Sequence, residues 1–312
     1  MTGNLALAYS AEPSLIIISN NDFAASRARA AAIAAGGRVL TQLTFAEALT
    51  RLDQQITPDT FLIEVTEDEG ASLDRALDHI DSIATRERCN LIASITPEMI
   101  DPVSARLLTV GTTILCSPTP AERVAAIAIA WSERNARVHD RSPDFDSMRL
   151  QHLADEVGRI AKTLASFTDG AALTGSAGVL NDAMLGYKFE VESPREDDVN
   201  AADIRSIIKL RRLRDKHFDA ELFADPAWDM MLDLMAARAE HSKVSVSSLC
   251  IAAAVPPTTA LRWIKTLTDQ GVFVRVADPT DGRRVFIELA DTAAANIAKY
   301  FVATRKHGGA VI

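Results

Sequence analysis

The sequence predicts an α/β plus α+β protein, with a parallel sheet covered by helices first and a helical segment closed by a two-stranded hairpin last. Residues 13–134 alternate apolar strands with alanine-rich helical patterns five times, whereas residues 244–290 have the order helix, turn, helix, hairpin. Length also favours two domains, because one hydrophobic core rarely serves 312 residues. We expect these domains at residues 1–136 and 201–312, with a helical connector and flexible linker at 137–200.

The charge of the chain is divided unevenly between these parts. The net charge is −9 overall, with −12 in residues 1–200 and +3 in residues 201–312. This asymmetry predicts that only the second part meets nucleic acid. The cysteines, Cys89, Cys116 and Cys250, are far apart and have no metal-ligand spacing. With no signal peptide and no apolar run near the roughly 20 residues of a membrane span, we expect a cytoplasmic protein with reduced thiols and no membrane contact.

Five strand–helix units are expected before the connector. Their strands are continuous apolar runs separated by amphipathic helices, which indicates a parallel sheet covered on both faces. Five such units, with functional loops after the carboxyl ends of the strands, form a flavodoxin-like (βα)5 arrangement. The expected strands are 15–19, 38–40, 60–65, 91–95 and 113–117, and the expected helices are 23–35, 45–54, 71–86, 97–108 and 121–134.

In fold, this pattern resembles a response-regulator receiver domain. A working receiver has acidic residues after its first strand that hold magnesium, and an aspartate at the end of its third strand that accepts phosphate. It also has a serine or threonine after the fourth strand, and a lysine before a proline after the fifth. At the matching positions this sequence has Asn21 and Asp22, Glu64, Ser94 and Thr96 as candidates for the hydroxyl, and Ser117. A longer carboxylate, without the lysine and with a weakened metal cradle, predicts a degenerate pocket that holds no metal or cofactor and is not phosphorylated.

The connector carries two patterns. Apolar residues from Leu150 to Phe167 recur at alternating spacings of three and four, which is a short heptad seam. Two interpretations stay open for it, a marginal coiled coil or a helix packed on the receiver-like domain. Residues 168–200 are rich in glycine and acidic side chains and contain Pro194, so a linker is expected there.

An amphipathic helix is expected from Ala201 to about Phe218, capped by Asn200. Its polar face carries six basic side chains, which would either follow DNA phosphates or stay solvated beside the acidic first part. The next helix begins at Pro226, and the final helix covers residues 291–305. Three apolar residues of this final helix are expected in a dimer interface: Ile297, Tyr300 and Phe301.

The last part of the chain predicts a winged helix-turn-helix. Ser247 supplies the cap of a first helix, and Pro257 begins a second helix that Gly271 stops. A tight turn at Asp281-Gly282 joins two alternating strands. In this motif the second helix is shaped to lie in the DNA major groove. The expected segments are strand 243–245, helices 247–254 and 257–270, and strands 272–278 and 285–290.

The second helix of this motif offers its first turns to DNA. Leu261, Ile264 and Leu267 recur at helical spacing and face the core, which leaves polar and basic side chains outward. Hydroxyls bond bases or phosphates, arginine binds guanine with two hydrogen bonds, and lysine neutralises phosphate. The arginines at the hairpin tip are placed to follow a minor groove or the backbone. The residues expected to contact DNA are Ser247, Pro257, Thr258, Thr259, Arg262, Lys265, Arg283 and Arg284.

The segment from Trp228 to Tyr300 resembles the MarR-type winged helix regulators in its order of elements and in its wing. There, Asp281-Gly282-Arg283 matches the family's acidic residue, spacer and arginine. The resemblance implies a homodimer that places paired recognition helices in successive major grooves of double-stranded DNA. It covers only the last third of the chain. Pro256-Pro257 replaces the polar residues usual at the start of the recognition helix, so the family's base preference is not carried over.

These patterns together predict a homodimeric, sequence-specific DNA-binding transcriptional regulator rather than an enzyme. The sequence has no phosphate-binding glycine loop, no nucleophile elbow and no paired metal-ligand histidines. The receiver-like domain would adjust dimer geometry, bind a protein partner, or serve as a plain scaffold. The alternative is a protein-interaction adaptor, in which the receiver-like and winged-helix domains bind partners without DNA.

Overall fold

The computed structural model describes residues 12–107, 111–139, 200–218 and 220–306. We call the described residues up to 139 the N-terminal half and those from 200 onward the C-terminal half. The described residues up to 129 and those from 200 onward belong to one compact unit. The heptad seam and the linker predicted for the connector lie outside the described residues, so both stay predictions.

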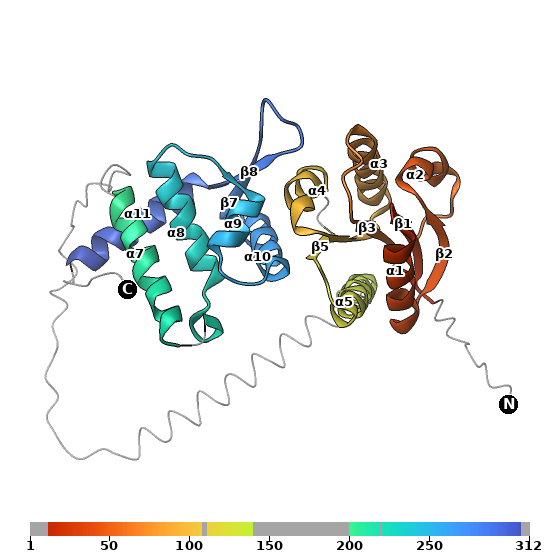
Figure 1. Cartoon of the computed structure of the whole chain (residues 1–312), viewed down its shortest axis with the longest axis horizontal. Coiled ribbons are helices and arrows are strands. Elements are labelled where there is room, and N and C mark those ends of the chain that lie inside the picture. The colour runs from red at the N-terminus through yellow and green to blue at the C-terminus, as the bar shows by residue number, and fades with distance from the viewer. Residues whose placement is uncertain (1–11, 108–110, 140–199, 219, 307–312) are drawn as a thin grey trace, which may run out of the picture. The chain divides into compact units, whose positions relative to one another are not determined.

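The N-terminal half is a parallel sheet with helices on both faces. Its strands are β1 (Ser14–Ser19), β2 (Arg38–Leu43), β3 (Thr60–Val65), β4 (Asn90–Ile95) and β5 (Thr112–Cys116). Its helices are α1 (Asp22–Ala34), α2 (Phe45–Arg51), η1 (Leu52–Gln54), α3 (Ala71–Glu87), η2 (Pro97–Met99), α4 (Ile100–Arg106) and α5 (Pro120–His139). The strand order β2-β1-β3-β4-β5 is that of flavodoxin-like sheets, which confirms the predicted parallel sheet. Figure 1 shows α1 and α5 on one side of the sheet and α2, α3 and α4 on the other.

Burial and capping explain why these segments form strands and helices. Every residue of β3 is buried, as expected for a central strand covered on both faces. The side chain of Asn21 caps α1 by accepting hydrogen bonds from the amides of Phe23 and Ala24. Thr44 and Glu47 form a capping box at the start of α2, in which each side chain bonds the other residue's amide.

The C-terminal half is helical and contains a small antiparallel sheet. Its helices are α7 (Ala201–Leu213), η5 (Arg214–Lys216), η6 (Ala220–Phe223), α8 (Pro226–Ala239), α9 (Val246–Ala252), α10 (Pro257–Asp269) and α11 (Asp291–Lys306). Its strands are β6 (Val244–Ser245), β7 (Phe273–Ala277) and β8 (Val285–Leu289), in the order β6-β8-β7. The predicted succession of short strand, helix, turn, helix and hairpin is therefore present.

Two helix boundaries test the local signals in this half. Pro257 is the first residue of α10, and Gly271 ends the helix with a φ of 71°, a left-handed conformation that glycine adopts without strain. The prediction that Ser247 caps the preceding helix is wrong. Ser245 is the cap, because its hydroxyl accepts from the amide of Ser248. Ser247 lies inside the first turn, where its own amide and hydroxyl are free to bond elsewhere.

The last helix packs on the core of its own half. The Trp228 ring on α8 meets the Tyr300 ring on α11 edge to face, with centroids 5.2 Å apart. Ile297 and Phe301 are buried, so the prediction that both line a dimer interface is wrong for this conformation. Tyr300 alone of the three is exposed. None of the helices in the described part of the chain is long and apolar enough to cross a membrane.

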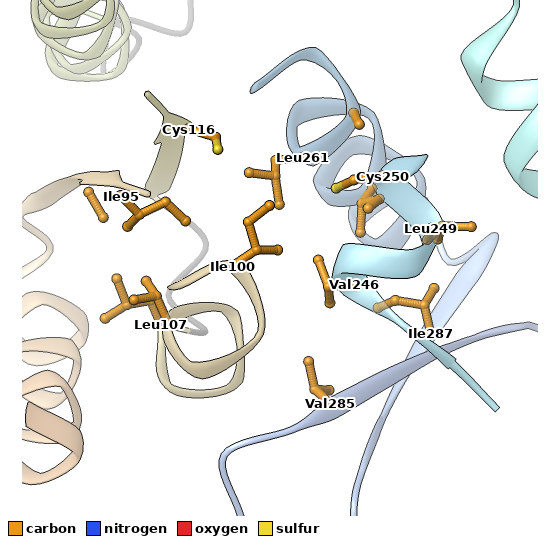
Figure 2. Close-up of a cluster of buried hydrophobic side chains, with 14 of the residues drawn as sticks. Ile95, Ile100, Leu107, Cys116, Val246, Leu249, Cys250, Leu261, Val285 and Ile287 are labelled. Carbon is orange, nitrogen blue, oxygen red and sulfur yellow. The ribbon is translucent and has the colours of Figure 1, made fainter. Parts of the chain in front are cut away.

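A cluster of buried apolar side chains draws on both halves of the chain. Side chains of the N-terminal half come from the end of β4, from α4 and its carboxyl end, and from β5. Side chains of the C-terminal half come from α9, α10 and β8. Those labelled in Figure 2 are Ile95, Ile100, Leu107, Cys116, Val246, Leu249, Cys250, Leu261, Val285 and Ile287.

Candidate nucleic-acid interface

Helix α10 has the amphipathic form expected of a recognition helix. Leu261, Ile264 and Leu267 are buried, as their spacing predicts. Arg262 is exposed on the opposite face, as is Pro257 at the helix start, and Thr259 is half-buried. Helix α10 therefore packs on the core through one face and presents the other face outward.

Thr258, in the first turn of α10, bonds the N-terminal half. Its hydroxyl accepts a hydrogen bond of 2.9 Å from the amide of Cys116 and donates one of 3.2 Å to the carbonyl of the same residue. Cys116 is the last residue of β5, an edge strand of the parallel sheet. A side chain predicted to reach DNA is thus satisfied within the chain.

Ser247 on α9 also bonds the N-terminal half. Its amide donates to one carboxylate oxygen of Asp101 at 2.9 Å, and its hydroxyl donates to the other at 2.5 Å. Asp101 lies in the first turn of α4. A carboxylate that accepts an amide and a hydroxyl at once imitates the way a phosphate group is bound at the start of a helix.

The wing arginine Arg283 forms the densest set of these contacts. Its guanidinium donates to both oxygens of Asp68, at 2.8 and 2.6 Å, and through Nε to Asp74 at 3.1 Å. Hydrogen bonding to Arg283 is the main reason why the pKa of Asp68 lies below its usual range. Paired carboxylates thus occupy the guanidinium as a phosphate would. Arg275 on β7, which was not predicted to take part, donates to the carbonyl of Ser104 on α4.

The other predicted DNA residues do not contact the N-terminal half through any described hydrogen bond or ion pair. Lys265 bonds Asp269 one turn later at 2.7 Å. Arg284 at the hairpin tip is 61% exposed, with Asp281 3.6 Å away. The predicted DNA-contacting set therefore divides into three groups. Three residues bond the N-terminal half: Ser247, Thr258 and Arg283. Three others are exposed, Pro257, Arg262 and Arg284, and two are half-buried, Thr259 and Lys265.

The basic face of α7 is largely used inside the C-terminal half. Arg205 pairs with Glu240, the C-cap of α8, and with Asp233 of α8, and these partners hold its pKa above the ordinary arginine value. Arg211 is buried and bonds Asp229 at 2.7 Å. The prediction of a solvated or phosphate-following face is therefore wrong for these arginines, because α8 supplies carboxylates along the whole contact with α7.

A cavity of about 240 Å³ opens at the carboxyl ends of β3, β4 and β5. Of the predicted receiver-like pocket residues, Glu64, Thr96 and Ser117 line it. Asn21 and Asp22 do not line it, so their predicted place in the pocket is wrong. Asn21 instead caps α1, and Asp22 is exposed in the first turn of that helix.

The cavity contains an arginine that sequence reasoning missed. Arg123, in the first turn of α5, donates to Glu64 at 3.3 Å through Nε and at 2.9 Å through Nη2. The cation beside the strand-end carboxylate thus comes from the helix, since Ser117 stands where a receiver has its lysine. The only available signal was a basic residue among apolar neighbours in a helix that covers the sheet.

Glu64 is 1% exposed, and its burial dominates its chemistry. Burial raises the pKa of Glu64 to about 7, against the opposing pull of Arg123, Ser94 and Arg27. Burial likewise lowers the pKa of the Arg123 guanidinium. Within the described ranges, no group of three or more histidine, cysteine or acidic side chains could hold a metal ion.

Comparison with known proteins gives a limited result. No protein-family model matches the chain, and no curated protein matches it. The adhesin competence repressor AdcR from Streptococcus pyogenes is similar over 26% of this chain and 58% of its own, with 18% identity and a TM-score of 0.20. Heme-free PefR is similar over 34% of this chain and 93% of its own, with 17% identity and a TM-score of 0.20.

A third solved structure has similar values. The structure of Bordetella bronchiseptica BpsR concerns the regulation of that protein's DNA binding by 6-hydroxynicotinic acid. BpsR is similar over 33% of this chain and 76% of its own chain. Its identity is 15% and its TM-score is 0.21. This chain therefore matches a little over half of the AdcR chain, and each similarity is confined to about a third of this chain or less.

Proposed function

We propose that this protein is a sequence-specific DNA-binding transcriptional regulator whose N-terminal half covers part of the DNA-contacting surface in the conformation described. The observation that carries the proposal is the pairing of Arg283 with Asp68 and Asp74. The guanidinium of this wing arginine donates hydrogen bonds to two carboxylates. The same group can form two parallel hydrogen bonds with one anion, and a DNA phosphate is such an anion. Ser247 and Asp101 repeat the arrangement at the start of α9.

The winged-helix order of the C-terminal half supports the same proposal. Helix α10 follows a short turn after α9, and the β7–β8 hairpin follows α10, so recognition helix and wing belong to one small core. Arg262 is exposed on the outer face of α10, and Arg284 is exposed on the wing. We expect Arg262 to read bases in the major groove and Arg284 to contact phosphate.

Covering and DNA binding would compete, because both use the same side chains. Solvent-exposed ion pairs such as Arg283–Asp68 contribute only about 0–1 kcal/mol, so a phosphate can replace the Asp68 carboxylate at modest cost. The other partner, Asp74, is buried and keeps Arg106 at 3.5 Å. The apolar cluster in Figure 2 contributes more, since separating its two sides would return buried apolar surface to water. DNA or an effector would then act by shifting a population between covered and uncovered forms.

The N-terminal half would regulate without being phosphorylated. The carboxylate of Glu64 is buried and already engaged by Arg123, which leaves it poorly placed to attack a phosphoryl donor. The segment after β1 also lacks the acidic residues that would hold magnesium, and its Asn21 caps α1 instead. Both features argue against phosphorylation.

A homodimer is proposed from exposed apolar side chains of the C-terminal half. They lie on α7, on the segments after it, and on α11. Exposed apolar side chains cost free energy while they face water, and gathered in a patch they are typical of a protein interface. Its members are Leu210, Leu213, Phe218, Leu222, Phe223 and Tyr300.

The proposal is tested with one charge reversal and its neighbour as control. Asp68→Lys removes the bidentate partner of Arg283, whereas Glu69→Lys makes the same charge change at the adjacent exposed residue, for which no pair with Arg283 is described. We expect Asp68→Lys to bind genomic DNA fragments about fivefold more tightly than Glu69→Lys in fluorescence anisotropy. Affinity of every form should fall steeply with added salt. Equal affinities for the two variants would reject the covered state, and no binding by any form in dilute buffer would reject DNA binding.

Two further variants separate base reading from phosphate contact. Arg262→Ala should reduce the preference for the selected site over random DNA by about 1–3 kcal/mol. Arg284→Ala should weaken all sequences alike and lower the salt slope by about one. A loss of preference in Arg284→Ala equal to that in Arg262→Ala would contradict these roles.

The second candidate function is a protein-interaction adaptor without DNA binding. It is favoured by the use of Thr258 and Arg283 inside the chain, which leaves fewer groups for a duplex. An adaptor would show neither the salt dependence nor the difference between the two lysine variants.

A further inference from the structure

We infer that the cavity at the carboxyl ends of β3, β4 and β5 is a non-covalent binding site for a small, doubly charged oxyanion of the sulfate and phosphate class. This inference concerns a ligand of the N-terminal half and does not require DNA binding. It differs from receiver chemistry, because no phosphoryl group is transferred and no metal takes part.

The lining of the cavity is made of anion-binding groups. Hydroxyls reach it from the ends of three successive strands, and two arginines reach it from helices on one face of the sheet. Hydroxyl and guanidinium donors are the groups that proteins use to bind sulfate and phosphate oxygens. The polar lining residues are Arg27, Glu64, Thr66, Ser94, Thr96, Ser117 and Arg123.

Ser94 lies at the end of β4 beside the Glu64 carboxylate and is 2% exposed. Its interaction as a hydrogen-bond donor to Glu64 lowers the pKa of that carboxyl, and no other partner of its hydroxyl is described. An oxyanion in the cavity would compete with Glu64 for this hydroxyl, as it would for Arg123.

The charge of the lining favours an anion over a cation. Glu64 is matched by Arg123, and Arg27 adds a second positive charge at the exposed rim of the cavity. Arg27 is close enough to both groups to lower the pKa of Glu64 and that of Arg123. A metal ion would need further carboxylates, but Asp22 does not line the cavity.

The size of the cavity fits a small ligand with water. Its volume of about 240 Å³ is several times the roughly 30 Å³ that one water molecule occupies in the liquid. A tetrahedral oxyanion and a few waters would therefore fill it. The ligand would compete with Glu64 for the guanidinium of Arg123, so the carboxylate sets the affinity.

The test measures sulfate binding to the full chain by isothermal titration calorimetry at constant ionic strength, in chloride buffer without DNA. Arg27→Gln should weaken sulfate binding about tenfold, because it removes a positively charged hydrogen-bond donor from the rim of the cavity. Arg29→Gln is the matched control, since Arg29 is exposed on the same helix but does not line the cavity. Glu64→Gln should strengthen binding severalfold by removing the competing negative charge.

Ser94→Ala keeps the inference testable if Glu64→Gln fails to fold. It removes only the Ser94 hydroxyl from the lining, and we expect about threefold to tenfold weaker binding. Phosphate in place of sulfate should bind with similar affinity, and acetate, a single charge, should bind less tightly.

Three outcomes would overturn the inference: no heat of binding at millimolar sulfate, equal weakening by Arg27→Gln and Arg29→Gln, or sulfate affinity unaffected by Ser94→Ala. None of these outcomes bears on the proposed DNA binding, because the titration contains no duplex. Conversely, a chain that binds no DNA would still be expected to bind sulfate at this cavity.

Discussion

Two arginine–carboxylate pairs in this chain have the same chemistry and opposite surroundings. In the cavity, the side chains of Arg123 and Glu64 are 4% and 1% exposed. At the wing, those of Arg283 and Asp68 are 30% and 45% exposed, although their hydrogen bonds are at least as short. Bond length alone would rank the wing pair as the stronger one. Solvent reverses that ranking, because water competes for the wing charges and is excluded from the cavity pair.

This difference assigns the two pairs different tasks. Removing one partner of the buried pair leaves the other charge without solvation, so Glu64 and Arg123 each depend on the other being present. Breaking the wing pair leaves both groups in water, so Arg283 can exchange Asp68 for another anion at little cost. The hydrogen bonds between Arg283 and Asp68 are short, but breaking them costs little free energy, as expected of a contact that can be exchanged.

The largest effect is expected from Arg123→Met. This change leaves Glu64 buried without its cation and should lower the free energy of unfolding by about 3–5 kcal/mol at pH 8, measured by urea denaturation. The double variant Glu64→Leu with Arg123→Met should recover most of that loss, because no buried charge remains. A loss below about 1 kcal/mol in the single variant would mean that the pair is solvated like the wing pair.

The next largest effect is expected in the pH dependence of the free energy of unfolding, which should distinguish the buried pair from the wing pair. Glu64 has a pKa of about 7 in the folded chain, above its ordinary value of 4.5, so the folded state binds more protons between these pH values. The free energy of unfolding should therefore fall as pH rises from 5 to 7, by on the order of 1–3 kcal/mol. The groups that face Glu64 from the packed elements are Arg123, Arg27 and Ser94. The slope should disappear in Glu64→Gln, and an equal slope in that variant would assign the effect to other residues.

A smaller effect is expected at a second buried pair, Arg211 with Asp229 in the C-terminal half. Asp229 also lies 3.3 Å from Arg212, so Arg211→Met leaves the carboxylate with one cation. We expect a loss of about 1–3 kcal/mol, less than for Arg123→Met. Equal losses for the two variants would show that Arg212 gives no compensation.

The smallest effect is expected from Asp68→Asn. Arg283 keeps Asp74 and gains water, so the free energy of unfolding should change by less than about 1 kcal/mol. High salt should shrink even this difference. A loss as large as that of Arg211→Met would show that the wing contact is a structural pair rather than an exchangeable one.

Local signals in the sequence were enough for most of the secondary structure. Continuous apolar runs marked the parallel strands, Pro257 marked the first residue of α10, and Gly271 marked its end. Each of these depends on the conformational limits of a residue and its near neighbours, which do not change with the rest of the fold. Local signals did not distinguish two serines near the start of α9, Ser245 and Ser247, because either residue type can cap a helix.

The sequence by itself determined a parallel α/β half, a winged-helix half, and an acidic-to-basic division of charge between them. Only the tertiary structure decided which charges meet, since the partners are 59 residues apart for Arg123 and Glu64 and 215 residues apart for Arg283 and Asp68. Helical and strand periods place a side chain on a face of its own element. These periods carry no information about which distant element packs against that face. The electrostatic free energy of a charged side chain depends on the element that packs there, because that element sets the side chain's burial and its partners.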